Sequence, residues 1–148
     1  MAKILILESI QNEYLASKIL SSVNDILEEN KFTIDTISVN EPFSLLCSAS
    51  TSLELHDYDG VIILGTVFKD TPLENKLIYQ EILRCFCDLS VHYALPVGFG
   101  MVLATDKEAA FSSIEKKART AAHSCVDLIK FKNQFGLIAN ESFARYNN

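Results

Sequence analysis

The stretch VIILGTVFKDTPLE at residues 61–74 changes character halfway along. Residues 61–67 are apolar without alternation, which is typical of a strand covered on both faces, as in a parallel sheet. A lysine, an acid, a hydroxyl and a proline follow closely, and from Pro72 onward the apolar residues recur at helical spacing. The stretch therefore predicts a buried strand that delivers polar groups to the start of a helix.

On both sides of this stretch, short apolar runs alternate with helical patterns. We expect strands at residues 3–7, 32–39, 61–67 and 97–103, and helices at 15–29, 42–53, 72–92 and 106–129, the last capped by Asp106. Such alternation predicts an α/β fold with a parallel sheet between two layers of helices. We expect one domain over residues 1–132 and a polar C-terminal tail at 133–148.

Composition excludes several classes of protein. The formal net charge is −6 and the 13 Lys and Arg are scattered, so nucleic acid is not an expected partner. The first apolar run, residues 4–7, is too short for a signal peptide or a membrane span, and we expect a cytoplasmic protein. The four cysteines and three histidines lack metal-ligand spacing. We predict no metal, and reduced, mostly buried thiols.

In open parallel sheets, ligands bind beyond the carboxyl ends of the strands. Here these ends are residues 8–12, 39–44, 66–74 and 103–106, and none carries a glycine-rich phosphate loop. Residues 66–71 place backbone donors and Lys69 before a helix, which is a natural seat for an anion. The alternative is an ordinary strand-to-helix connection capped by Thr71, and the pattern alone favours this alternative.

Three segments resemble motifs of one enzyme family. QNEYLASKIL at 11–20 is similar to F-N-x-x-I-x-x-x-L-L, and YDGVIILGTVFKDT at 58–71 is similar to YDAVIALG-x-V-I-R-G-x-T. PVGFGMVLATDKEAA at 96–110 is similar to P-V-x-F-G-V-L-T-T-x-x-x-E-Q-A. The chain thus resembles 6,7-dimethyl-8-ribityllumazine synthase, also called the riboflavin synthase beta chain, in order up to about residue 132.

The resemblance implies a flavodoxin-like, four-stranded parallel sheet in a three-layer αβα sandwich. It also implies a homo-oligomer, either a pentamer or a decamer, with active sites shared between neighbouring subunits, and riboflavin synthase as a partner. The family condenses 5-amino-6-ribitylaminouracil with 3,4-dihydroxy-2-butanone 4-phosphate, without a metal or organic cofactor. The aromatic residues of the C-terminal tail either cover a neighbouring subunit or fold back on their own domain.

Carried over by position, the resemblance implies a substrate pocket with several departures from the family pattern. Gln11 stands at the family's stacking aromatic, Ser44 at its ribityl-binding Glu, and Ser113 at its phosphate-binding Arg, with Lys116 and Lys117 as the nearest cations. The substrate-binding positions are Gln11, Asn12, Pro42, Phe43, Ser44, Thr66, Val67, Phe68, Lys69, Asp70, Thr71, Phe99 and Ser113.

The catalytic His of the family has no matching histidine here. Aligned without a gap, Glu74 occupies its position and becomes the expected catalytic residue; with a one-residue gap, Leu73 does. Two hypotheses follow. The protein is a working synthase with a rebuilt site, or it is a catalytically impaired homologue that acts as an oligomeric binding or scaffold protein.

Overall fold

Strands and helices alternate along the chain. The structure is a computed structural model that describes residues 2–68 and 71–147, with side chains described as far as residue 136. The elements in chain order are β1 (Lys3–Ser9), α1 (Glu13–Glu29), β2 (Thr33–Ser38), α2 (Ser44–Leu55), β3 (Gly60–Val67), α3 (Pro72–Tyr93), β4 (Val97–Leu103) and α4 (Lys107–Asn147). The predicted βαβαβαβα order is therefore confirmed.

The four strands form one parallel sheet in the order β2-β1-β3-β4. Ile4 of β1 lies between Ile34 of β2 and Gly60 of β3, and Val61 pairs with Val97 of β4. Every residue of the central strand β3 is buried, whereas the edge strands β2 and β4 expose part of their side chains. The predicted α/β class and four-stranded parallel sheet are confirmed.

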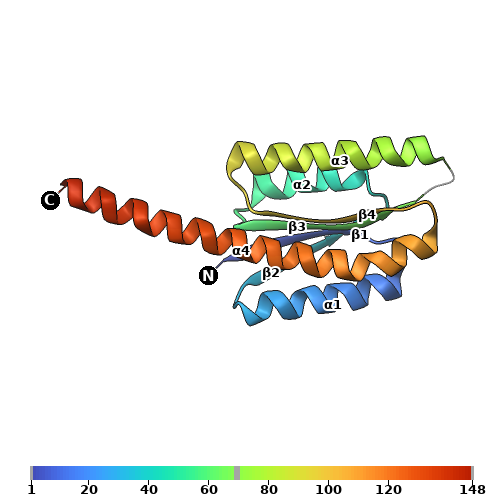
Figure 1. The fold of residues 1–148 in the computed structure, drawn as a ribbon, viewed down its shortest axis with the longest axis horizontal. Helices are drawn as coiled ribbons and strands as arrows, with labels where there is room; N and C mark the ends of the chain where they lie inside the picture. Colours follow the sequence, from blue (N-terminus) through green and yellow to red (C-terminus); the bar gives the residue numbers. More distant parts are fainter. Residues whose placement is uncertain (1, 69–70, 148) are drawn as a thin grey trace.

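Two helices cover each face of the sheet (Figure 1). Ile4, Ile6 and Ile62 pack against α1 and α4, whereas Leu5 and Leu7 point to the opposite face, where α2 and α3 lie. Successive residues of a strand point to opposite faces, so the unbroken apolar runs of β1 and β3 supply both cores. The result is the three-layer sandwich that the alternating pattern predicts.

Glycines in β4 let α4 approach the sheet closely. A Cβ atom added at Gly98 would lie 2.2 Å from the carbonyl oxygen of Ala121, a distance no real Cβ tolerates. The face of α4 that meets β4 is correspondingly small, with buried Ala118, Ala121 and Ala122. This close packing fixes the position of α4 along the sheet edge.

The last helix is longer than the sequence pattern predicts. We expected it to end at residue 129, but α4 continues to Asn147 and projects past the sheet (Figure 1). Residues 130–147 contain no proline and a single glycine, Gly136, which costs a helix only about 1 kcal/mol. The expected helix end was wrong because residues 130–136 are all exposed, and a helical segment without a buried face resembles a tail in sequence. No helix in the described part of the chain is long and apolar enough to cross a membrane.

The cysteines are less buried than expected. All four are free thiols, but only Cys125 is buried; Cys85 is half-buried, and Cys47 and Cys87 are exposed. The expectation of mostly buried thiols was wrong because Cys47 and Cys87 lie on the outer faces of α2 and α3.

Candidate functional site

The carboxyl ends of β1, β2 and β3 bring three loops together. Gln11 follows β1, Pro42 and Phe43 precede α2, and Phe68 follows β3. The backbone N–H of Gln11 donates to the hydroxyl of Thr66 at 3.3 Å, which ties the first loop to β3. The sheet therefore gathers residues that lie far apart in the sequence, as the carboxyl-end rule predicts.

These loops enclose a small cleft, here called the carboxyl-edge cleft. Its cavity volume is about 20 Å³, which is room for about one water molecule. Its lining residues are Gln11, Glu41, Pro42, Phe43, Val67, Phe68 and Ile78. Phe43 remains 59% exposed, so its ring is open to a further molecule. Within one chain this cleft is too small to hold an organic ligand.

The start of α3 lies at the same edge of the sheet. Thr71 occupies the N-cap position, as expected, but its hydroxyl makes no cap bond and instead donates to the Glu74 carboxylate at 3.0 Å. The backbone N–H of Asn75 donates to the Thr71 carbonyl at 3.1 Å. Lys69 and Asp70, both predicted site residues, lie outside the described residues.

A second and larger groove runs between the edge strand β4 and α4. It has a cavity volume of about 540 Å³ and is called the β4 groove here. Its lining residues are Val97, Phe99, Ser112, Ser113, Lys116, Lys117, Thr120, Ala121 and Ser124. Both Ser112 and Ser113 donate to the carbonyl of Ala109, and Lys116 and Lys117 place positive charge in the groove.

The Phe99 ring contacts another aromatic ring. Tyr79 of α3 meets it edge-on, with 5.8 Å between the ring centroids. Burial raises the pKa of Tyr79, so this phenol stays neutral beside the Phe99 ring at physiological pH. The pair is a rigid aromatic support at the sheet edge rather than a source of charge.

The structure divides the predicted site residues among three places. Gln11, Pro42, Phe43, Val67 and Phe68 line the carboxyl-edge cleft, and Phe99 and Ser113 line the β4 groove. Other predicted residues line neither cavity: Asn12, Ser44, Thr66, Thr71 and Glu74. Asn12 instead caps α1, where its side-chain oxygen accepts from the backbone N–H of Leu15 at 2.9 Å. Thr66 is fully buried.

Sequence reasoning missed several residues at this edge. Glu8 is only 4% exposed, and its carboxylate accepts from the backbone N–H of Ile10 at 2.6 Å, which holds the first loop in place. The sequence shows only an acidic residue near the end of an apolar strand, which does not predict that its carboxylate binds the loop backbone. Thr120 and Ser124 were recoverable, because they follow Ser113 at helical spacings of seven and eleven residues.

Comparison with known proteins identifies the family. A family model described as 6,7-dimethyl-8-ribityllumazine synthase matches residues 1–133. The chain belongs to this family. The enzyme of that name from Agrobacterium fabrum is 26% identical over 142 residues, which cover 90% of this chain and 96% of the relative. The one from Xanthobacter autotrophicus is 28% identical over 143 residues, which cover 90% of this chain and 86% of the relative.

Membership of the lumazine synthase family confirms the resemblance found in the sequence. Lumazine synthase 1 of Mesorhizobium japonicum is also similar, with 27% identity over 146 residues, or 91% of this chain and 88% of the relative. The family match ends at residue 133, close to where α4 leaves the sheet. Among the residues whose side chains are described, no three His, Cys, Asp or Glu side chains are grouped so that they could hold a metal ion.

Proposed function

We propose that this protein is a 6,7-dimethyl-8-ribityllumazine synthase. It condenses 5-amino-6-ribitylaminouracil with 3,4-dihydroxy-2-butanone 4-phosphate, and it uses neither a metal nor an organic cofactor. The observation that carries the proposal is the family match over residues 1–133, with relatives of that name that align over nearly their whole length. Holding two reactive molecules together contributes about 7–11 kcal/mol to such a reaction without any special chemical group.

The active site is proposed to lie between two copies of the chain. Those predicted pocket residues that line a cavity are divided between two cavities of one chain, and the carboxyl-edge cleft has a volume of only about 20 Å³. A neighbouring chain that lays its β4 groove against this cleft would enlarge it and add Phe99 and Ser113. The neighbouring chain and the pyrimidine ring of the substrate would then both lie over the exposed ring of Phe43.

The β4 groove supplies the charge for the phosphate ester in this arrangement. Lys116 and Lys117 are cations of this groove, whereas the hydroxyls of Ser112 and Ser113 are engaged with the carbonyl of Ala109. Thr71 and Lys69 are proposed to assist from the start of α3, where helix N–H groups favour an anion. Replacing both Lys116 and Lys117 by Gln should raise the KM for the butanone phosphate and leave the KM for the pyrimidine substrate nearly unchanged.

Glu74 is proposed as the group that moves protons. It lies on the first turn of α3, and the hydroxyl of Thr71 donates to its carboxylate. A general acid–base group of this kind contributes about 10²–10⁴ in rate. Glu74→Gln should therefore lower kcat about a hundredfold or more. The matched control is Glu81→Gln, which alters a carboxylate further along the same helix.

A binding or scaffold protein without turnover is the second candidate function. It is favoured by the engagement of polar groups within the chain, since Ser113 donates to Ala109 and Asn12 caps α1. The deciding measurement mixes purified protein with both substrates and follows the fluorescent lumazine. Formation well above the protein-free rate supports the synthase, whereas a rate equal to that control supports the scaffold.

Mixing two defective variants tests the shared site. Phe43→Ala damages the cleft side, and Lys116→Gln with Lys117→Gln damages the groove side. If each site combines the two sides from different chains, co-assembled variants form some intact sites and regain turnover. No regain after co-assembly has been verified would show that one chain supplies both sides.

The α3 helix offers a surface for assembly. Six exposed positions recur at the alternating four- and three-residue spacing of a helix-packing seam: Leu73, Leu77, Gln80, Arg84, Cys87 and Val91. Leu73 is 71% exposed and Val91 is 86% exposed, so a chain that covered these side chains would bury apolar surface, which is favourable. We propose a homo-oligomer, a pentamer or a decamer, in the cytoplasm, with riboflavin synthase as a partner.

A further inference from the structure

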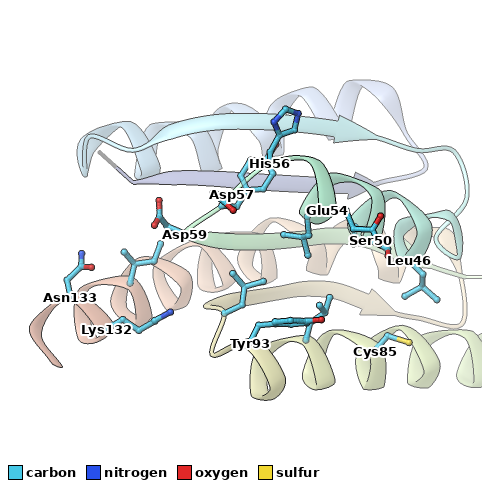
Figure 2. A pocket seen from close by; sticks show the side chains of 16 residues that line it. Leu46, Ser50, Glu54, His56, Asp57, Asp59, Cys85, Tyr93, Lys132 and Asn133 are labelled. Carbon is cyan, nitrogen blue, oxygen red and sulfur yellow. The ribbon is translucent and has the colours of Figure 1, made fainter. Parts of the chain in front are cut away.

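A separate cleft lies at the amino ends of the strands, opposite the carboxyl edge. It is bounded by α2, α3, α4 and the loop before β3, and Figure 2 shows side chains from these segments around a common space. Its cavity volume is about 700 Å³, which is within the range of about 300–1,000 Å³ found for small-molecule sites. This amino-edge cleft takes no part in the proposed reaction.

The floor of the amino-edge cleft is apolar and only partly covered. Leu53 of α2, Leu89 of α3 and Leu95 before β4 are half-buried there. Tyr93, the last residue of α3, stands at the cleft and is 68% exposed. An apolar body that covered these side chains would remove further apolar surface from water, which is favourable.

The charged groups around this floor are mostly acidic. Among the residues whose side chains are described, Glu54, Asp57 and Asp59 line the cleft against a single cation, Lys132. The ammonium of Lys132 already donates to the carbonyl of Ala94 at 2.7 Å, and the carboxylate of Asp59 accepts from the backbone N–H of Lys3 at 2.8 Å. Glu54 and Asp57 have no hydrogen-bond or ion-pair partner within the described part of the chain.

We propose that the amino-edge cleft binds an organic amine, a molecule with an apolar or aromatic body and a primary ammonium group. The body lies over Leu53, Leu89 and Leu95 and against the Tyr93 ring. The ammonium group pairs with the carboxylates of Glu54 and Asp57, where a carboxylate or phosphate would be repelled. The cavity and its apolar floor make the site, and the charge selects the class of ligand.

Dansylcadaverine is a suitable probe because it joins an aromatic body to a primary amine. Its binding to the full-length protein is followed by fluorescence anisotropy and compared with N-acetylated dansylcadaverine, which has the same body without the charge. We expect saturable binding that is several-fold tighter for the amine. Glu54→Gln and Asp57→Asn should each weaken amine binding about fivefold, whereas Glu29→Gln, at the end of α1, should not. Tyr93→Ser should weaken both probes equally.

Cys85 reports where the probe binds, because it lines the amino-edge cleft and is half-buried. In a Cys47→Ser, Cys87→Ser background, a maleimide labels Cys85 while Cys125 stays buried. Saturating dansylcadaverine should slow this labelling. The proposal is overturned if both probes bind equally, if Glu54→Gln and Asp57→Asn change nothing, or if labelling is unaffected. None of these readouts depends on lumazine formation.

Discussion

Gly98 is the residue at which a single methyl group should matter most. A Cβ there would meet the Ala121 carbonyl oxygen at 2.2 Å, and neither backbone can yield without moving α4. We expect Gly98→Ala to lower the free energy of unfolding by about 1–3 kcal/mol, which is typical of overpacking. Urea denaturation measures this change. The control is Gly136→Ala, where no atom lies within 4 Å. Alanine at that exposed position, beyond the core, should leave the free energy of unfolding nearly unchanged. Equal effects of the two variants would contradict the close packing of α4.

Asp35 provides a test of electrostatics at the amino edge. The pKa of Asp35 is lowered. The largest cause is the Tyr58 hydroxyl, which donates to the Asp35 carboxylate at 2.7 Å, and the second is the Lys3 ammonium, which also donates to it. A carboxyl group whose pKa is lowered in the folded state stabilises the fold at pH values above its unfolded-state pKa of about 3.9. This stability is lost as the pH falls through the folded-state pKa. Tyr58→Phe should raise the pKa of Asp35 and make the acid loss shallower.

Carbon NMR of the Asp35 carboxyl group measures that pKa directly, and urea denaturation at a series of acidic pH values measures the stability. Tyr79→Phe is the control, because Tyr79 lies beside Phe99 rather than Asp35. An unchanged pKa of Asp35 in Tyr58→Phe would show that the hydrogen bond does not set it.

For single residues, the sequence predicts where a side chain lies in the fold better than it predicts what that side chain binds. Phe43 and Val67, which the family resemblance implies as substrate-binding residues, both line the carboxyl-edge cleft, because they follow or end strands at that edge of the sheet. Thr66 and Val67 are adjacent and both buried, but alternation points them to opposite faces, and only Val67 lines the cleft. Glu8 was missed because hydrogen bonds to a loop backbone leave no pattern in the sequence.

Asn12, at the start of α1, has two proposed roles: it caps the helix and it binds substrate. Its side chain accepts from the Leu15 N–H, so Asn12→Ala should cost about 1 kcal/mol of stability. Asn12→Ser keeps an N-cap acceptor and should keep the stability. If Asn12 also binds substrate, as the family resemblance implies, Asn12→Ser should lower turnover in thermally stable protein. Normal turnover in that variant would restrict Asn12 to capping.

The projecting end of α4 should contribute little to the stability of the sheet. Residues 133–136 are exposed and nothing lies within 4 Å of a Cβ at Gly136, whereas Ile129 is 3% exposed and belongs to the core. Deleting residues 137–148 should change the free energy of unfolding by less than about 0.5 kcal/mol and reduce the helical circular dichroism signal. A larger loss would mean that this segment packs on the protein, against the proposed division at residues 132 and 133.

At the element scale, the sequence was most informative where burial was greatest. β3 was recognisable because all of its residues are buried and, apart from Thr66, none is polar. The weaker pattern of β2 follows from its place at the sheet edge, where Thr33 and Ser38 face water. The continuation of α4 past residue 129 was not predictable, because residues 130–136 are all exposed and helical periodicity is visible only when one face is buried.

For the whole molecule, the α3 seam predicts how assembly and activity are linked. Leu77 is 57% exposed on this seam, and Leu77→Glu should place like charges at a contact between copies. We expect smaller particles by light scattering, and lower lumazine formation because each proposed site needs two chains. Lys76→Glu is the control, one residue away and outside the seam. Full assembly and turnover in Leu77→Glu would exclude α3 as the contact.

The straight run of α4 beyond the sheet has a practical consequence for protein engineering. From Asn133 to Asn147 the helix advances about 21 Å. A reporter domain fused behind it would be carried on a stiff stalk, clear of the sandwich. Where several chains associate, their stalks would display such cargo at spacings set by the assembly's own symmetry.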